Sequence, residues 1–251
     1  MKKILLIITS LFFIVACEQD GGGGDVSSTE SNNIDGQGGS LAKFTLKNDY
    51  LYTVDINKLN TFSIIEEKNP VKVNEQFIGF DIETLFGYKD YLYIGSETGM
   101  FIYDITNPEF PKELASVNHF TACDPVIAND THAFVTLHSD SFCGNDINLL
   151  EIYDVTNITD PILISSRNLT QPRGIGLYDN FLIVCDDEIK VFDISNPEES
   201  KLVNSFDREA FDVIVQNDLL IAIGSSGLYQ FSLEKDTEKG VLLNPLSELE
   251  I

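Results

Sequence analysis

Positive charge is scarce in this sequence of 251 residues. Only 16 lysines and arginines stand against 40 aspartates and glutamates, which gives a formal net charge of −24. A polyanionic chain repels phosphate backbones, so nucleic-acid binding is excluded. The acids do not form a calcium loop, because the pattern Asp-x-Asp-x-Asp-Gly does not occur. The acidic run Asp186-Asp187-Glu188 is interpreted as a solvated turn.

The common catalytic motifs are also missing. There is no Gly-x-Ser-x-Gly elbow, no His-Glu-x-x-His helix and no phosphate-binding loop. The three histidines are His119, His132 and His138. We interpret His132 and His138 as separate surface residues at the two ends of one strand, rather than as a metal-binding pair. The sequence therefore predicts no catalytic residue, no metal and no cofactor.

Long apolar runs are missing except at the start of the chain. The run from Ile4 to Ala16 has 13 residues and follows two lysines. It is too short for a helix to cross a bilayer of about 30 Å, and it fits a secretory signal peptide over residues 1–16. The sequence Ile14-Val15-Ala16-Cys17 resembles the lipobox of bacterial lipoproteins, with Ile14 and Val15 in place of the commoner Leu and small residue. The resemblance implies a diacylglycerol on Cys17, which cleavage leaves at the mature N-terminus.

Residues 17–39 have the composition of a tether. From Glu18 onward only Val26 and Ile34 are apolar, so this stretch cannot bury enough surface to fold. A flexible chain of this length spans roughly 25 Å. Its early acids resemble the surface-export signals of some Bacteroidota lipoproteins, although a merely solvated tether explains them equally well. We expect a bacterial envelope lipoprotein, in the outer membrane and either periplasmic or surface-exposed.

From residue 40 onward the sequence repeats itself. Similar apolar runs begin at positions 50, 91, 133, 181 and 219, and each is followed by a second run. Three of the second runs end in related turns, at residues 104–108, 154–161 and 193–197, which are built from Asp, Thr or Ser, Asn and Pro. Asn and Ser/Thr side chains bond to nearby backbone and Pro fixes φ, so these turns end a strand.

The period identifies an architecture. Four short strands in about 42 residues are typical of a β-propeller blade. Runs such as Phe181–Cys185 are apolar at consecutive positions, so both faces must be covered, as neighbouring blades would do. Residues 40–251 therefore predict an all-β, five-bladed propeller of four-stranded antiparallel blades, with an open solenoid or a sandwich as the alternative.

The repeated pattern resembles the LVIVD-repeat proteins. An aromatic and aliphatic run is followed by a second run that ends in Asp-Ile/Val-Ser/Thr-Asn. The first and fifth units lack this ending, as terminal repeats often do. The resemblance implies a β-propeller, often secreted or lipid-anchored, and carries no catalytic residues.

Three cysteines remain once Cys17 is lipidated. The compartment beyond the inner membrane is oxidising, so we expect a disulfide between Cys123 and Cys143. It would pin the insertion around Cys143 to the propeller face and contribute about 3 kcal/mol at most. A Cys-Asp-Pro followed by a Cys-Gly insertion also resembles a recurring feature of such lipoproteins. Cys185 ends an apolar run and is predicted to be a small buried side chain.

A candidate ligand site follows from the propeller geometry. The segments that lead into the innermost strands should meet at one mouth of the central channel, and their charged residues are Lys43, Asp81, Glu83, Asp124, Arg173 and Asp212. Such a ring could form a polar pocket that prefers a cation or a polyhydroxylated neutral ligand. A water-filled channel whose charges only solvate one another is the simpler alternative.

Three classes of function fit this sequence. The leading one is a lipid-anchored envelope module that binds another envelope protein or a small polar ligand. The others are a structural docking component of an envelope complex and an extracellular hydrolase that uses carboxylates of the ring.

The lipid anchor is directly testable. Cys17→Ser removes the thiol that would carry the diacylglycerol, so the variant should be released from membranes or stall in processing. Detergent-phase partitioning measures this outcome. Wild-type partitioning of the variant would contradict the lipoprotein interpretation.

Overall fold

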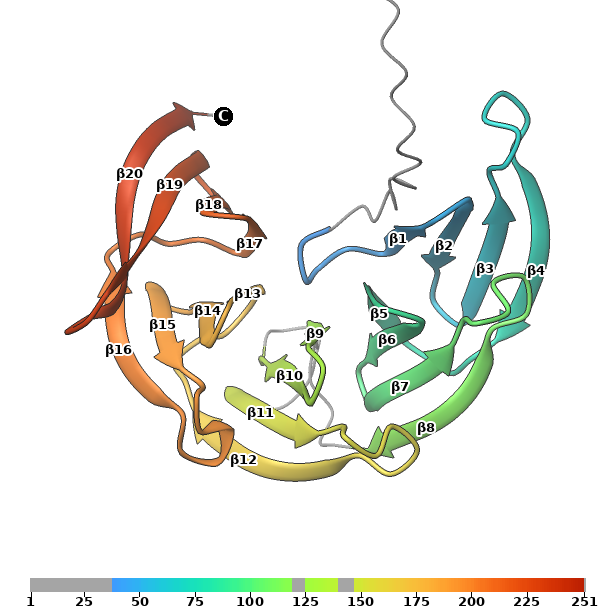
Figure 1. The fold of residues 1–251 in the computed structure, drawn as a ribbon, viewed down its shortest axis with the longest axis horizontal. Coiled ribbons are helices and arrows are strands. Elements are labelled where there is room, and N and C mark those ends of the chain that lie inside the picture. The colour runs from blue at the N-terminus through green and yellow to red at the C-terminus, as the bar shows by residue number, and fades with distance from the viewer. Residues whose placement is uncertain (1–37, 119–124, 140–146, 251) are drawn as a thin grey trace, which may run out of the picture. The chain divides into compact units, whose positions relative to one another are not determined.

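Five antiparallel sheets make up the part of the chain that the computed structural model describes, residues 38–118, 125–139 and 147–250 (Figure 1). Each sheet has four strands in chain order, and together they confirm the predicted five-bladed propeller. In these same residues no helix is long and apolar enough to cross a membrane.

Each sheet is called a blade and is numbered along the chain. Blade 1 comprises β1 (Phe44–Lys47), β2 (Tyr50–Val54), β3 (Lys58–Ser63) and β4 (Val71–Phe77). Blade 2 comprises β5 (Ile82–Tyr88), β6 (Tyr91–Ser96), β7 (Gly99–Asp104) and β8 (Lys112–Asn118). Blade 3 comprises β9 (Val126–Ala128), β10 (His132–Leu137), β11 (Leu149–Asp154) and β12 (Ile162–Asn168). Blade 4 comprises β13 (Ile175–Tyr178), β14 (Phe181–Cys185), β15 (Ile189–Asp193) and β16 (Lys201–Phe206), with the 3₁₀ helix η1 (Pro197–Glu199) before β16. Blade 5 comprises β17 (Asp212–Gln216), β18 (Leu219–Gly224), β19 (Gly227–Asp236) and β20 (Gly240–Glu250).

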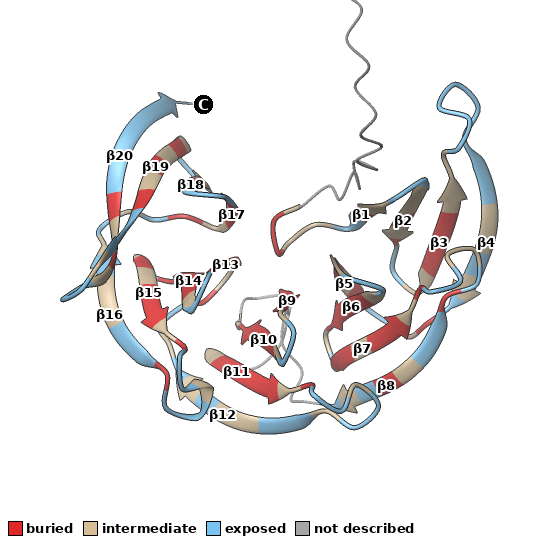
Figure 2. Ribbon diagram, viewed as in Figure 1, coloured by how far each residue is buried: buried red, intermediate tan, exposed pale blue. Residues whose placement is uncertain are grey.

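The second strand of a middle blade is buried on both of its faces. In β6 the consecutive residues Leu92, Tyr93 and Ile94 are all almost completely buried, and β10 and β14 show the same pattern. Figure 2 shows these strands in red, whereas the outer strands β8, β12 and β16 are mostly exposed. Neighbouring blades therefore supply the core, as the consecutive apolar runs predicted.

The repeated Asp-containing turns form local hydrogen bonds. The side chain of the Asp accepts a bond from the backbone N–H two residues later, and the turn closes with a further backbone bond. The first bond is 2.7 Å at Asp104, 2.8 Å at Asp154 and 2.9 Å at Asp193. The closing bonds run from Phe110 to Asn107, from Asp160 to Asn157 and from Glu199 to Asn196. The turn is therefore largely preformed by its own sequence.

These turns also hold neighbouring blades together. The Tyr52 hydroxyl of blade 1 donates to the Pro108 carbonyl of blade 2 at 2.9 Å. Polar side chains of one outer strand donate to carbonyls in the turn before the next blade's outer strand, or at the start of that strand: Asn74 to Glu109, Gln76 to Pro111, Ser165 to Glu198, Arg167 to Ser200 and Asn204 to Val241. We call this recurring contact the turn clasp. It gives the repeated motif a role between blades as well as within one.

The ring of blades is open at one border. The inner strands pack in succession, β1 with β5, β5 with β9, β9 with β13 and β13 with β17. Among the described residues, blades 5 and 1 make no packing of that extent. Figure 1 shows residues 38–42 in blue at the inner end of this gap, between β17 and β1. We call residues 38–42 the strap.

The turn clasp predicts a measurable loss of stability. Tyr52→Phe removes a fully buried hydroxyl and leaves the Pro108 carbonyl without this partner. The free energy of unfolding should fall by about 1–2 kcal/mol. Urea denaturation measures it, and Tyr50→Phe is the control, because water can replace the bond from Tyr50 to the Glu109 side chain. Equal effects of the two substitutions would contradict the buried clasp.

Candidate functional site at the channel mouth

Two of the predicted ring residues lie at or just before the start of their inner strands, within electrostatic reach of one buried thiol. Arg173 precedes β13 and Asp212 begins β17, and the charges of both act on the Cys185 thiol. Cys185 is a free, fully buried cysteine, which confirms that part of the cysteine prediction. Burial raises the pKa of its thiol well above the usual value, and the nearby Asp212 carboxylate raises it further.

Asp212 holds the strap. The Ser40 hydroxyl donates to the Asp212 carboxylate at 3.1 Å and accepts the Ile175 N–H at 2.8 Å. The backbone N–H groups of Leu41 and Val213 also donate to this carboxylate. Burial nevertheless raises the pKa of Asp212, because desolvation outweighs these bonds. The side chain therefore joins the start of the described chain to blade 5.

Close packing around Asp212 explains two glycines. A Cβ at Gly39 would lie 2.1 Å from the Asp212 carboxylate, and one at Gly174 would lie 2.4 Å from it. Neither position can accept a larger residue without displacing this side chain. The strap and the loop before β13 therefore both pack closely against the Asp212 carboxylate.

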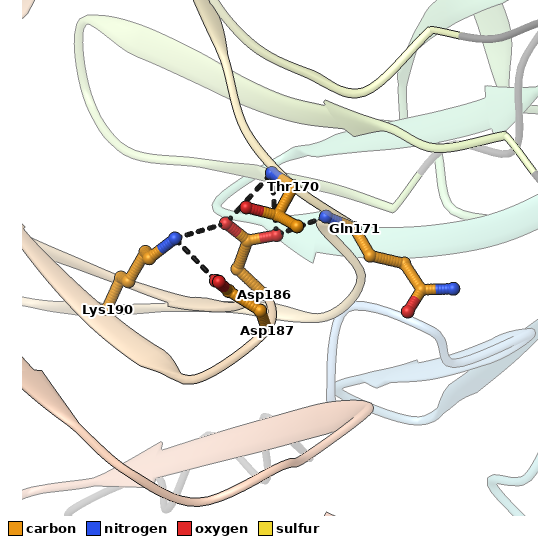
Figure 3. A network of polar contacts seen from close by, with 5 residues as sticks. All are labelled: Thr170, Gln171, Asp186, Asp187 and Lys190. Atoms are coloured by element: carbon orange, nitrogen blue, oxygen red, sulfur yellow. Dashed lines mark hydrogen bonds and ion pairs between the residues drawn. The ribbon is translucent and has the colours of Figure 1, made fainter.

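A second buried carboxylate fixes the loop that carries Arg173 (Figure 3). The Asp186 side chain accepts bonds from the backbone N–H groups of Thr170, at 3.0 Å, and Gln171. Lys190 donates to Asp186 at 2.6 Å and also pairs with Asp187. The interpretation of residues 186–188 as a solvated turn was therefore wrong for Asp186, which is only 4% exposed.

Backbone bonds complete the position of Arg173. Its N–H donates to the Cys185 carbonyl at 2.7 Å, and the Cys185 N–H donates to Gly174 at 2.8 Å. The Thr136 hydroxyl of blade 3 donates to the Arg173 carbonyl at 2.5 Å. The loop is thus held by blades 3 and 4 together.

The other predicted ring residues are not gathered in the same way. Lys43 and Asp81 are exposed and Glu83 is half-buried, while Asp124 lies outside the described residues. Asp81 has a φ of 52°, which presents it from a tight left-handed turn before β5. The binding role of the six residues stays a prediction.

The middle of the channel is nearly filled. The cavity on the axis measures only about 60 Å³, room for about two waters. Its lining is mostly apolar and includes Phe86, Ile127, Ile175 and Val213, together with Gly38 and Ser40 of the strap. The polar groups lie at the channel mouth because the strap and inner-strand side chains fill the middle.

The histidines lie as the strand pattern predicted. His132 begins β10 and His138 directly follows it, so the two are at opposite ends of one strand, while His119 lies outside the described residues. Burial lowers the pKa of His132. Over residues 38–118, 125–139 and 147–250, no three His, Cys, Asp or Glu side chains gather as a possible metal site.

Sequence reasoning missed an exposed aromatic group at this same mouth. Phe77 is 59% exposed and Phe80 69% exposed, and their rings meet edge to face at 5.2 Å. The neighbouring Ile56 is 72% exposed, and its carbonyl accepts the Ile82 N–H. We call Ile56, Phe77 and Phe80 the aromatic patch. The repeat carries part of this signal, since blades 2 and 3 have Asn118 and Asn168 where blade 1 has Phe77, although blade 4 has Phe206 there.

Comparisons with known proteins agree with the fold. A family model described as LVIVD repeat matches residues 87–119 and 172–208, so the chain is a β-propeller that carries LVIVD repeats. No curated protein matches it. Its sheets are similar to a functionally unknown protein from Desulfotomaculum acetoxidans, with 11% identity over 83% of this chain and 69% of that one, at a TM-score of 0.66.

Two further solved structures show the same likeness. The periplasmic gluconolactonase of Pseudomonas aeruginosa has 13% identity over 81% of this chain and 68% of its own, with a TM-score of 0.62. A protein from Lactobacillus plantarum has 12% identity over 80% and 67%, with a TM-score of 0.65. At these identities the likeness shows the fold alone.

The strap contact should depend on pH through Asp212. Because its pKa is raised on folding, the folded protein binds this proton more tightly than the unfolded chain does. The stability of the wild type relative to Asp212→Asn should therefore rise as pH falls through the folded pKa, and level off below the ordinary value of about 3.9. Urea unfolding of both proteins between pH 7 and pH 3 measures this difference. The exposed Asp90→Asn is the control, and a difference that falls with falling pH would contradict the assignment.

Proposed function

We propose that this protein is a non-catalytic interaction module, held at the bacterial cell envelope by a lipid on Cys17. Cys17 lies outside the described residues, and the lipobox-like sequence and the tether composition support the anchor. Cys123 and Cys143 also lie outside them, and their proposed disulfide would stiffen the face that carries Arg173. The outer membrane is the proposed location.

The aromatic patch is the observation that carries the interaction role. Large apolar side chains exposed this far and gathered together are typical of protein-binding surfaces. The fold does not require a phenylalanine at position 77, because the equivalent positions of blades 2 and 3 hold asparagine, whereas Phe206 at that position of blade 4 packs against Phe231 of blade 5. The acids Asp55 and Asp81 lie beside the patch in sequence and favour a neutral or basic partner surface.

The ring carboxylates give less support to a hydrolase. The oxygens of the Asp212 carboxylate accept hydrogen bonds from Ser40, Leu41 and Val213 of its own chain. This supports a structural role for Asp212. The likeness to a periplasmic gluconolactonase is a likeness of fold alone.

The interaction role is tested by removing the patch. A Phe77→Ser, Phe80→Ser double variant should lose about tenfold of its chemical cross-linking to envelope proteins in intact cells, the loss expected for about 1.4 kcal/mol of contact free energy. Phe110→Ser is the matched control, because Phe110 is 60% exposed on the outer turn of blade 2. Both variants should unfold at nearly the wild-type temperature. Undiminished cross-linking of the double variant would refute the role of this patch.

A further inference from the structure

The two blades that border the gap each have one apolar face that is only partly covered. In blade 5, Ile221, Ile223 and Leu228 are half-exposed, and they alternate with buried residues that pack against blade 4. Leu249 lies in the same cross-strand row as Ile223 and Leu228 and is 64% exposed. This is the open face of blade 5.

Blade 1 has a corresponding open face. Leu46, Leu51 and Phe62 form one cross-strand row and are half-exposed. The matching row of blade 5 is Val215, Leu220 and Phe231, which is buried against blade 4. The same positions are therefore core where a blade has its preceding neighbour and partly exposed where it does not.

Half of a turn clasp lies on each side of the gap. Ser247 of β20 occupies the position of Asn74 and Asn204, which donate to the next blade, but its hydroxyl donates to Gln230 of its own blade. The outer turn of blade 1 closes through a bond from Asn69 to Glu66, as the clasped turn of blade 2 closes from Phe110 to Asn107. One border of the gap therefore carries a donor strand, β20, and the other border carries an acceptor turn, residues 66–69, as the blades inside the ring do.

The strap prevents these two faces from meeting each other. Ser40 is 1% exposed and bonded to both Asp212 and Ile175, so it fills the inner end of the gap. The backbone of Gly39 passes so close to Asp212 that a Cβ there would lie 2.1 Å from the carboxylate. Closure of blade 5 on blade 1 would have to expel the strap and leave a buried carboxylate without these partners.

A second copy of this chain is also a poor occupant. Each copy carries a net charge of −24, and exposed acids lie on both borders of the gap, at Glu66, Glu67, Glu248 and Glu250. A second copy that offered one blade would bring its other blades into the same space. The charge instead favours an occupant with a basic rim.

The geometry points to a docking site in the gap between blades 5 and 1 for one β-sheet of blade size, which has two apolar faces and a basic rim and belongs to another polypeptide. This inference rests on the proposed interaction role but uses a different surface from the aromatic patch. Its contacts would continue the blade-to-blade interface that this chain already makes four times.

A covalently attached sixth blade is the direct probe. A copy of residues 169–206, which contain a complete blade 4 and the segment before it, is appended after Ile251. In this copy Glu188→Lys, Glu198→Lys and Glu199→Lys give the added blade the basic rim that the inference requires. If the gap accepts a blade, the unfolding temperature should rise by about 5 °C or more, the shift expected for a blade interface of a few kcal/mol. Ile223→Glu is the matched control. It should change the unextended chain by less than about 2 °C, because Ile223 is half-exposed there, and should abolish the gain in the extended chain.

Cross-linking in cells identifies the natural occupant. A photoreactive phenylalanine analogue in place of Leu228 should capture a different polypeptide, and the fused sixth blade should abolish this capture by occupying the gap. No thermal gain from the sixth blade, or a cross-link that survives it, overturns the inference. A self-cross-link, or an intramolecular disulfide in a Ser247→Cys, Lys68→Cys variant, overturns it in favour of a second copy or of closure. The Phe77→Ser, Phe80→Ser variant could lose its chemical cross-linking to envelope proteins while the gap experiments give negative results. That outcome would uphold the interaction role and refute the docking site in the gap.

Discussion

Each blade has two apolar faces and can cover neither of them by itself. This constraint determines most of the structure. It explains why strands such as β6 and β14 are apolar at consecutive positions and buried on both sides. It also makes the stability of one blade depend on its neighbours, so the contacts between blades matter as much as the hydrogen bonds within a sheet.

The polar groups of the protein serve the same constraint. In the turn clasp, side chains of one outer strand donate to carbonyls of the next blade. These hydrogen bonds join neighbouring blades at the rim, where the outer strands are largely exposed. At the channel mouth, Asp186 fixes the loop that connects blades 3 and 4, and Asp212 fixes the strap against blade 5. Both carboxylates are therefore structural supports at the points where the chain crosses between sheets.

The fold could be predicted from the sequence because its signals are local and repeated. The strands that begin at Tyr50, Tyr91, Phe181 and Leu219 start at the predicted residues, and β10 starts one residue earlier, at His132. The roles of Asp186 and Ser40 could not be predicted, because the backbone N–H groups that they bind are 15 or more residues away in sequence. Arg173 and Asp212 lie at or just before the start of an inner strand, where the repeat predicted them, and their role in binding stays a prediction.

The strap was missed because residues 38–42 look like the end of a polar tether. Gly39 and Ser40 have no apolar side chain, and hydrophobic patterning gives them no reason to be buried. Their burial follows from hydrogen bonds to Asp212 and from the small size of glycine, which lets the backbone pass close to a carboxylate. The sequence likewise does not reveal that the strap and inner-strand side chains fill the middle of the channel.

The acidic composition and the open apolar faces are consistent with each other. A chain with half-exposed rows such as Ile221, Ile223 and Leu228 would be expected to associate with itself through the hydrophobic effect. A net charge of −24 opposes that association, because two copies repel each other before their faces can meet. The same charge attracts a partner of opposite sign. The excess of acids, which at first only excluded nucleic acid, thus selects between occupants of an apolar surface: it disfavours a second copy and favours a basic protein.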